Sequence, residues 1–352
     1  MGQIGGIALL NGLLGVLTLG VYRFWGKTRL RRYLWSRVNF DGDRMEYTGR
    51  PLELLLGFLI AIFILTLLGI VFAAVEFVFP DNEVVLGISG VIQGLGFAFL
   101  IQIAIYRARR YRLTRTQWRG IRGGQSGSAI RYALLAFGWY FVAFLTLGLA
   151  YPVTRTRLQR YRTKNTWMGD RGFAFEGRAG DLFARWFIAW LLLIPTLGMS
   201  LFWYQANEFR YFAGKTRYGA LQFHSQLRTG RVIWIGMRYL LIVLLLFGVL
   251  FAATAMMVPG LMGAVEAMNA GDEAVIEAMG PSVVLVPFAM LILFSVVSGV
   301  LQAALYLHPM LAEICWTLRI AGDEDFAAIA QSRQYSPSRG EGLADALDVG
   351  AI

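Results

Sequence analysis

The chain has 352 residues, of which 57% are hydrophobic and 16% charged, and its formal net charge is +11. Soluble domains are less apolar and about 25% charged, and the mean hydropathy here is +0.55. The composition therefore excludes a soluble fold, a disordered chain and a collagen-like chain. One cysteine, Cys315, and two histidines exclude a disulfide framework and a classical zinc site. The chain is predicted to be an integral membrane protein.

Apolar runs of about 20 residues are long enough to cross a bilayer as helices. Their lengths favour helices over the shorter, alternating strands of a barrel. The sequence contains seven such runs: Ile4–Trp25, Leu52–Phe79, Val84–Tyr106, Tyr132–Tyr151, Leu182–Tyr204, Val232–Val258 and Ser282–Leu307.

The basic residues are confined to five blocks, at 23–50, 107–131, 155–185, 210–238 and from Arg319 onward. The connectors 80–83 and 259–281 carry only acidic charge. Because lysine and arginine accumulate on the cytoplasmic side of membrane helices, runs two and three form a hairpin whose tip faces out, and so do runs six and seven. The first, second and fourth blocks and the tail are then cytoplasmic.

The third basic block, 155–185, conflicts with this rule if the runs on either side of it each cross once. We expect seven crossings, which would place this block outside. The alternative is five spanning helices with Tyr132–Tyr151 and Leu182–Tyr204 re-entrant, which would keep every basic block inside; Pro195 could mark the break in the second of these runs.

A repeated motif accompanies the first, fourth and fifth runs. Thr-Leu-Gly is followed after eleven residues by Arg-Tyr, and a glycine turn, a short alternating stretch and Gly-Arg come next. The alternating stretches are Met45–Tyr47, Phe173–Phe175 and Leu221–Phe223, and the Arg-Tyr pairs are Arg32-Tyr33, Arg160-Tyr161 and Arg210-Tyr211, with a looser copy at Arg110-Tyr111. Such periods indicate repeated supersecondary units and, in transporters, internal pseudo-symmetry.

We therefore expect an all-α membrane protein built from repeated units, each with a membrane helix, a basic helix and a short strand-like turn. The membrane domain covers residues 1–321, in units near 1–50, 51–130, 131–178, 179–230 and 231–321. Residues 322–352 are polar and are expected to form a disordered cytoplasmic tail.

The basic-aromatic stretches resemble the YjgN family of bacterial inner-membrane proteins. The similarity lies in Asn11–Trp35, Asp41–Gly49 and Tyr106–Gly120, and it extends over most of residues 1–240. The resemblance implies a multi-pass protein of the bacterial inner membrane whose activity is uncharacterised. It supplies no catalytic residue.

The arginines of the basic blocks are the candidate binding residues. A planar guanidinium donates two parallel hydrogen bonds to a phosphate or carboxylate, and each basic residue near an anionic surface contributes about 1 kcal/mol of attraction. The predicted anion- or lipid-binding set is Arg29, Arg31, Arg32, Arg109, Arg110, Arg157, Arg160 and Arg210.

Catalytic and metal-binding motifs are absent from the sequence. His224, His308 and Cys315 have no partner at metal-ligand spacing, and no nucleophile elbow, phosphate loop or dinucleotide fingerprint is present. We expect no enzyme activity, no metal and no cofactor.

Two functions fit these features. The first is a transporter or channel-like protein for an anionic or amphiphilic small molecule, which would need a polar cavity at mid-membrane. The alternative is a non-enzymatic envelope protein that binds anionic lipid or a protein partner through its basic cytoplasmic face. Phospholipid headgroups are the expected partner; nucleic acid is disfavoured because no binding module accompanies the charge.

Overall fold

The structure is a computed structural model that describes residues 2–270, 282–322 and 329. The chain divides into two compact units, one formed by Met1–Gly26 with Ile233–Ala312 and the other by Lys27–Val232 with Glu313–Ile352. Each unit is described by itself. The expected disordered tail lies outside the described residues, apart from Gly322 and Ile329.

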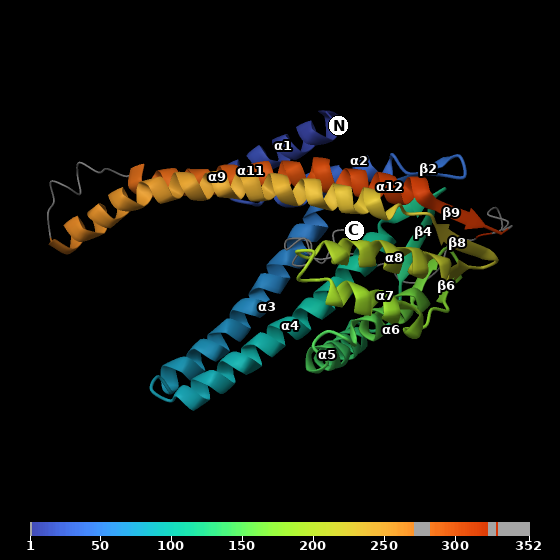
Figure 1. Ribbon diagram of the computed structural model, residues 1–352, viewed down its shortest axis with the longest axis horizontal. Coiled ribbons are helices and arrows are strands. Elements are labelled where there is room, and N and C mark those ends of the chain that lie inside the picture. The colour runs from blue at the N-terminus through green and yellow to red at the C-terminus, as the bar shows by residue number, and fades with distance from the viewer. Residues whose placement is uncertain (1, 271–281, 323–328, 330–352) are drawn as a thin grey trace. The chain divides into compact units, whose positions relative to one another are not determined.

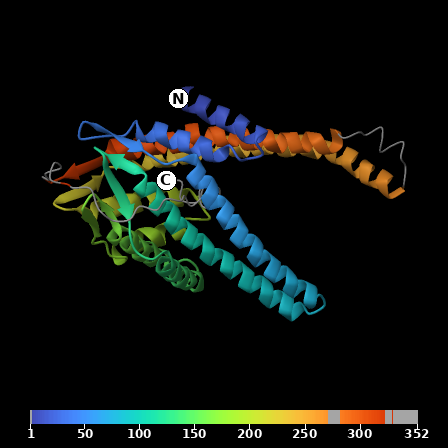
Figure 2. The same cartoon turned by 180° about the vertical axis from the view of Figure 1, so that it is seen from behind.

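The chain is mostly helical. Its helices are α1 (Gly2–Leu17), α2 (Arg23–Trp35), α3 (Pro51–Val78), α4 (Glu83–Thr114), α5 (Ala129–Leu145), α6 (Tyr151–Lys164), α7 (Gly180–Leu191), α8 (Met199–Gly214), α9 (Thr229–Ala270), α11 (Ser282–Leu301), the π-helical η1 (Gln302–Leu307) and α12 (His308–Thr317). Figure 1 shows α3 and α4 as a long hairpin, and they lie side by side again in the reverse view of Figure 2.

The strand-like stretches of the sequence belong to one antiparallel sheet, so an all-α description is too narrow. The strands are β1 (Asn39–Phe40), β2 (Asp43–Tyr47), β3 (Thr116–Trp118), β4 (Ile121–Gln125), β5 (Thr166–Met168), β6 (Arg171–Phe175), β7 (Thr216–Tyr218), β8 (Leu221–Ser225) and β9 (Leu318–Ala321). They are hydrogen-bonded in sequence order from β1 to β9. Two-residue turns such as Asp41-Gly42, with φ of 49° and 83°, close the hairpins as type I′ turns do.

Strands from successive hairpins pair in matching registers. Tyr47 lies opposite Thr116, Gln125 opposite Thr166, and Phe175 opposite Thr216. Each of these pairings joins segments that are separated along the chain by a pair of helices. The four helix–hairpin blocks of the 27–232 unit are therefore parts of one continuous sheet.

Four helices are long and apolar enough to cross a membrane, judged by length and composition over the described residues. These are Pro51–Val78, Glu83–Thr114, Thr229–Ala253 and Ala289–Thr317. They correspond to the second, third, sixth and seventh apolar runs. The predicted count of seven crossings is not confirmed.

The other three apolar runs are each broken at their Thr-Leu-Gly. The leucine and glycine both have positive φ, at 50° and 87° for Leu19-Gly20, 49° and 87° for Leu147-Gly148, and 48° and 83° for Leu197-Gly198. A right-handed helix cannot continue through such a pair. The runs Ile4–Trp25, Tyr132–Tyr151 and Leu182–Tyr204 are consequently two shorter helices each.

The threonine side chain of each turn forms hydrogen bonds with the helix before it and with the helix after it. Thr146 Oγ1 donates to the Val142 carbonyl at 2.9 Å and accepts from the Ala150 amide at 3.1 Å. Thr18 and Thr196 make the same two bonds. The side chain thus closes the first helix and caps the second.

After each turn the second helix runs back along the first. Thr154 Oγ1 donates to the Trp139 carbonyl at 3.0 Å, and Ser200 Oγ donates to the Ala189 carbonyl at 2.7 Å. In the first pair, Asn11 Nδ2 donates to the Gly26 carbonyl at 3.1 Å. The three Thr-Leu-Gly segments are therefore the tips of helical hairpins.

In the unit formed by 1–26 and 233–312, α1 packs closely on α11. A Cβ atom at Gly12 would lie 2.7 Å from Val296 Cγ1, so a larger residue would displace the Val296 side chain. Arg238 Nη2 donates to the Leu305 carbonyl of η1 at 3.3 Å. Small residues such as Gly12 let membrane helices pack closely.

Candidate functional site

The arginine of each Arg-Tyr pair binds the backbone of its own hairpin. Arg32 Nη2 donates to the Gly49 carbonyl at 2.9 Å, Arg160 Nη2 to Gly177 at 2.7 Å, and Arg210 Nη1 to Leu227 at 3.0 Å. Arg110 donates in the same way to Gly127. In all four cases the acceptor lies 17 residues later. These arginines fasten the end of each β-hairpin to its basic helix.

The tyrosine that follows binds the start of the preceding helix. Tyr111 donates to Glu53 at 2.7 Å and Tyr211 to Asp181 at 2.6 Å, while Tyr161 donates to the Ser128 carbonyl at 2.9 Å. Burial, followed by the hydrogen bond to Asp181, raises the pKa of Tyr211 to about 12 from its usual 10.0. Glu53 and Asp181 each stand 21 residues after an arginine of the motif, Arg32 and Arg160, and they have the same structural role.

The last copy of this arrangement replaces the tyrosine with Glu313. The backbone N–H of Gln226 donates to the Thr317 carbonyl at 2.9 Å. The backbone N–H of Glu176 donates to the Lys215 carbonyl in the same way, at 3.0 Å. Glu313 therefore occupies the place of Tyr211, four residues before the carbonyl. It accepts two hydrogen bonds from Arg228, at 2.8 and 3.0 Å. A bidentate ion pair takes over the role of the tyrosine hydroxyl.

The remaining predicted binding arginines lie in different surroundings. Arg29 is exposed on α2, Arg31 lies 5.9 Å from the centroid of the Tyr47 ring, and Arg157 lies 5.6 Å from that of Trp139. Arg109 is half-buried, with Arg112 and Arg162 as charged neighbours. Binding of anions by the eight predicted residues stays a prediction, and four of them already hold backbone carbonyls.

The backbone role of these arginines can be tested on α6, where Arg157 and Arg160 offer a matched pair. Arg160→Gln removes a charged hydrogen bond and should lower the free energy of unfolding by about 1–2 kcal/mol. Arg157→Gln loses only an exposed cation–π contact and should cost about 0.5 kcal/mol. Thermal unfolding of both variants in detergent, followed by tryptophan fluorescence, would reveal the difference. Equal effects would contradict a special role for Arg160.

A buried ion pair links α6 to α8 and was not predicted from the sequence. Arg155 Nε and Nη2 donate to the Glu208 carboxylate at 3.0 and 2.9 Å, and the Glu208 side chain is 6% exposed. Burial alone would lower the pKa of Arg155, but the hydrogen bonds and charge of Glu208 outweigh it and raise that pKa. Tyr151, Trp186 and Tyr204 pack around the pair.

A second unpredicted cluster lies where α4, α5 and α6 meet. The rings of Tyr106 and Tyr132 stack with centroids 4.8 Å apart, and that of Tyr161 lies within 6 Å of both. Arg162 Nε donates to the Tyr132 hydroxyl at 2.9 Å. The signal in the sequence was the run Tyr106–Tyr111, which was interpreted only as a loose copy of the Arg-Tyr motif.

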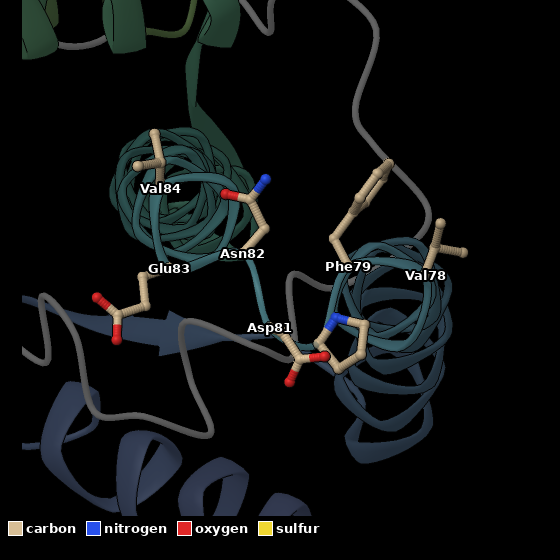
Figure 3. Close-up of a pocket in the computed structure, with 7 residues that line it drawn as sticks. Val78, Phe79, Asp81, Asn82, Glu83 and Val84 are labelled. Atoms are coloured by element: carbon tan, nitrogen blue, oxygen red, sulfur yellow. The ribbon is translucent and has the colours of Figure 1, made fainter.

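A hollow at the tip of the α3–α4 hairpin is lined by consecutive residues 78–84. Figure 3 shows the side chains of Phe79, Asp81 and Glu83 pointing away from one another. The polar groups of this hollow therefore do not converge on a common point. Over the described residues, no group of three or more His, Cys, Asp or Glu side chains is placed to hold a metal ion.

The fold defines a class of protein with apolar helices compatible with a membrane and a basic, sheet-forming region. The chain belongs to the DUF898 family of bacterial proteins of unknown function, whose model matches residues 1–202 and 187–337. This match is consistent with the resemblance to YjgN proteins. No curated protein and no solved structure matches the chain.

Proposed function

We propose that the protein is a multi-pass inner-membrane protein that binds anionic phospholipid on the cytoplasmic side, without enzymatic activity. The three Thr-Leu-Gly hairpins dip into the bilayer from that side, and the basic helices stay at the headgroups. The main support comes from the leucines at the hairpin tips.

These leucines are both strained and exposed. Leu19, Leu147 and Leu197 are 96%, 78% and 88% exposed and have left-handed φ angles. A left-handed conformation costs a side chain about 1–2 kcal/mol, and glycine would avoid that cost. Strain of this kind points to function. An apolar side chain at the tip of an apolar hairpin is suited to insertion between lipid chains.

The continuous sheet supports a one-sided arrangement of the basic blocks. Strands β1 to β9 are hydrogen-bonded neighbours, and backbone groups at an open sheet edge are not tolerated in the hydrocarbon core. A sheet cannot therefore have strands on both sides of a bilayer. The positive-inside rule assigns this side to the cytoplasm, and the third block lies there with the others.

Helix length distinguishes the spanning hairpin from the shallow ones. At about 1.5 Å per residue, the 28 residues of α3 reach beyond the hydrocarbon core of about 30 Å. The 17 residues of α5 and 12 of α7 fall short of it. We infer four spanning helices and three re-entrant hairpins, close to the re-entrant alternative drawn from the sequence.

The basic helices would then lie at the headgroups. Each exposed arginine near an anionic surface contributes about 1 kcal/mol, and Arg29 of α2 and Arg157 of α6 are exposed. The transport hypothesis requires a polar cavity at mid-membrane. The hollow of residues 78–84 lies at a hairpin tip and is not such a cavity.

An environment-sensitive fluorophore at a hairpin tip tests the proposal. In a Cys315→Ser background, Leu147→Cys carries the label, and Asp170→Cys in the β5–β6 turn is the matched control. In proteoliposomes, lipids with nitroxides on the acyl chains should quench the Leu147 probe several-fold more than the Asp170 probe. Equal quenching at the two positions would contradict insertion of the hairpins.

A further inference from the structure

The tip of the α5–α6 hairpin is held by two side chains of α7. Trp186 Nε1 donates to the Gly148 carbonyl at 2.9 Å. Trp190 Nε1 donates to the Leu147 carbonyl at the same distance. The two acceptors are the residues whose positive φ angles reverse the chain, and the two donors lie on one face of α7 because they are four residues apart. A helix of the following hairpin therefore supplies two hydrogen bonds to this turn.

These tryptophans are not part of the repeated scaffold. Counted from the arginine of the preceding Arg-Tyr pair, Arg160, they stand 26 and 30 positions later. None of the residues at the corresponding positions of the other copies has an indole N–H. Those residues are Phe58 and Ile62, Ala136 and Tyr140, and Gly236 and Leu240. The bonds to the tip are thus a particular feature of α7.

Other contacts join the α5–α6 and α7–α8 hairpins. Each of the helices from α5 to α8 packs against the next one (Figure 1). The Tyr151 ring stacks on Trp186 with centroids 4.5 Å apart, and the Tyr204 ring meets Trp186 edge-on at 4.8 Å. One turn further along the two basic helices, Arg155 and Glu208 form the buried ion pair described above. The two hairpins are therefore one packed body within the 27–232 unit.

The two indole donors matter most if the tip lies in lipid. Turn carbonyls in water are hydrated and need no donor from the protein. The hydrocarbon of a bilayer holds no water, so an unsatisfied backbone group is strongly unfavourable there. An indole is a suitable donor in that place, because its N–H is neutral and the rest of its ring is apolar. The outward side of α7 is apolar too, with Phe183, Phe187 and Leu191 exposed.

We infer that Trp186 and Trp190 are positioning residues for membrane insertion, and that the α5–α6 and α7–α8 hairpins enter the bilayer together as one wedge. The inference rests on the proposed membrane function and extends it, because it names the acyl chains of the lipid as the partner of these two hairpins. Without the two indoles, the carbonyls of Leu147 and Gly148 would take their hydrogen bonds from water, and the tip would stay at the headgroups.

Quenching of the label at Leu147→Cys tests the inference. The full chain, in the Cys315→Ser background, is reconstituted in vesicles of phosphatidylethanolamine and phosphatidylglycerol with or without nitroxides on the acyl chains. The ratio of the two fluorescence intensities cancels any direct effect of the indoles on the label. The double variant Trp186→Phe with Trp190→Phe should reduce the quenching several-fold, toward the level at Asp170→Cys.

Trp203→Phe is the matched control, since Trp203 packs against the same cluster from α8 whereas the bonds to the tip come from α7. This variant should leave the quenching at Leu147→Cys unchanged. The hydrogen bond itself is tested by comparing Trp190→Gln with Trp190→Phe. Glutamine keeps a neutral N–H donor, so it should retain more of the quenching than phenylalanine does. More quenching with phenylalanine would mean that the ring acts only by packing, and would contradict the positioning role.

A second label, at Leu197→Cys in the α7–α8 tip, reports on the other half of the wedge. With the tryptophans intact it should be quenched as the Leu147 label is, because the two tips enter together. It should stay quenched in the double tryptophan variant, which shows that this variant still folds and binds the membrane.

Three results would overturn the inference and leave the proposed function in place. They are an unquenched Leu197 label with the tryptophans intact, an unchanged Leu147 label in the double variant, and an equal loss of quenching at both tips in that variant. If the Leu147 label is quenched no more than the Asp170 label before any tryptophan is replaced, the proposed function fails and the inference fails with it.

Discussion

Glu208→Gln is expected to destabilise the protein severely. The change keeps the size of the side chain but leaves Arg155 without its counter-charge beside Tyr151, Trp186 and Tyr204. Removing one partner of a buried ion pair costs about 3–5 kcal/mol, and we expect about 3 kcal/mol because the Arg155 side chain is 31% exposed. For a domain of this size, that corresponds to a fall of roughly 6–12 °C in unfolding temperature.

Thermal unfolding in detergent, followed by tryptophan fluorescence, is a suitable measurement because Trp186 packs against this cluster. The control replaces both partners, as Arg155→Met with Glu208→Met, which removes both charges and keeps an apolar side chain at each position. Paired replacement of this kind is often neutral, so the double variant should regain most of the loss. If Glu208→Gln unfolds at the native temperature, the pair does not hold α6 against α8.

The strand-like stretches were predictable from the sequence, but their partners were not. Met45–Tyr47, Phe173–Phe175 and Leu221–Phe223 fall within β2, β6 and β8, because alternating apolar residues after a glycine turn are a local signal. The pairing of Met45 with Trp118 is not local. The helices α3 and α4 lie between them, and nothing in either segment specifies the register.

The predicted count of seven spanning helices rests on hydropathy, and it is not confirmed. Hydropathy adds residues along a run and does not detect a reversal of the chain within it. Leu147 and Leu197 contribute fully to an apolar run, although each has a left-handed φ that ends its helix. The recurrence of Thr-Leu-Gly was visible, but threonine, leucine and glycine each occur within membrane helices. Only the structure shows that the backbone N–H of the glycine donates to a carbonyl five residues earlier. For Gly148 the acceptor is Ala143, at 2.6 Å.

The anion-binding role of the eight arginines stays a prediction. The backbone roles of Arg32 and Arg160 could not be inferred without knowing where each hairpin ends. Glu208 was missed because its partner Arg155 lies 53 residues away. Tyr132 was missed because a tyrosine at the start of an apolar run resembles an interfacial anchor.

The third basic block is expected to lie on the same side of the membrane as the sheet, opposite the tip of the α3–α4 hairpin. In a Cys315→Ser background, single cysteines are placed at Asp170 in the β5–β6 turn and at Asp81 in the hairpin tip; both positions are exposed. A membrane-impermeant maleimide should label Asp81→Cys in intact spheroplasts. It should label Asp170→Cys only after lysis. The physical reason is that β5 and β6 are hydrogen-bonded to β4 and β7.

A third cysteine, at Arg217 in β7, provides the control for the fourth block, and it should behave as Asp170→Cys does. Labelling of Asp170→Cys in intact spheroplasts, with Arg217→Cys protected, would place adjacent blocks on opposite sides. That result would require the pairing of β6 with β7, in which Phe173 lies opposite Tyr218, to be absent in the membrane. It would restore the crossings by Tyr132–Tyr151 and Leu182–Tyr204 and would remove the basis for one-sided lipid binding. Protection of both positions leaves the third and fourth basic blocks on one cytoplasmic face, from which the hairpin tips at Leu147 and Leu197 can enter the bilayer.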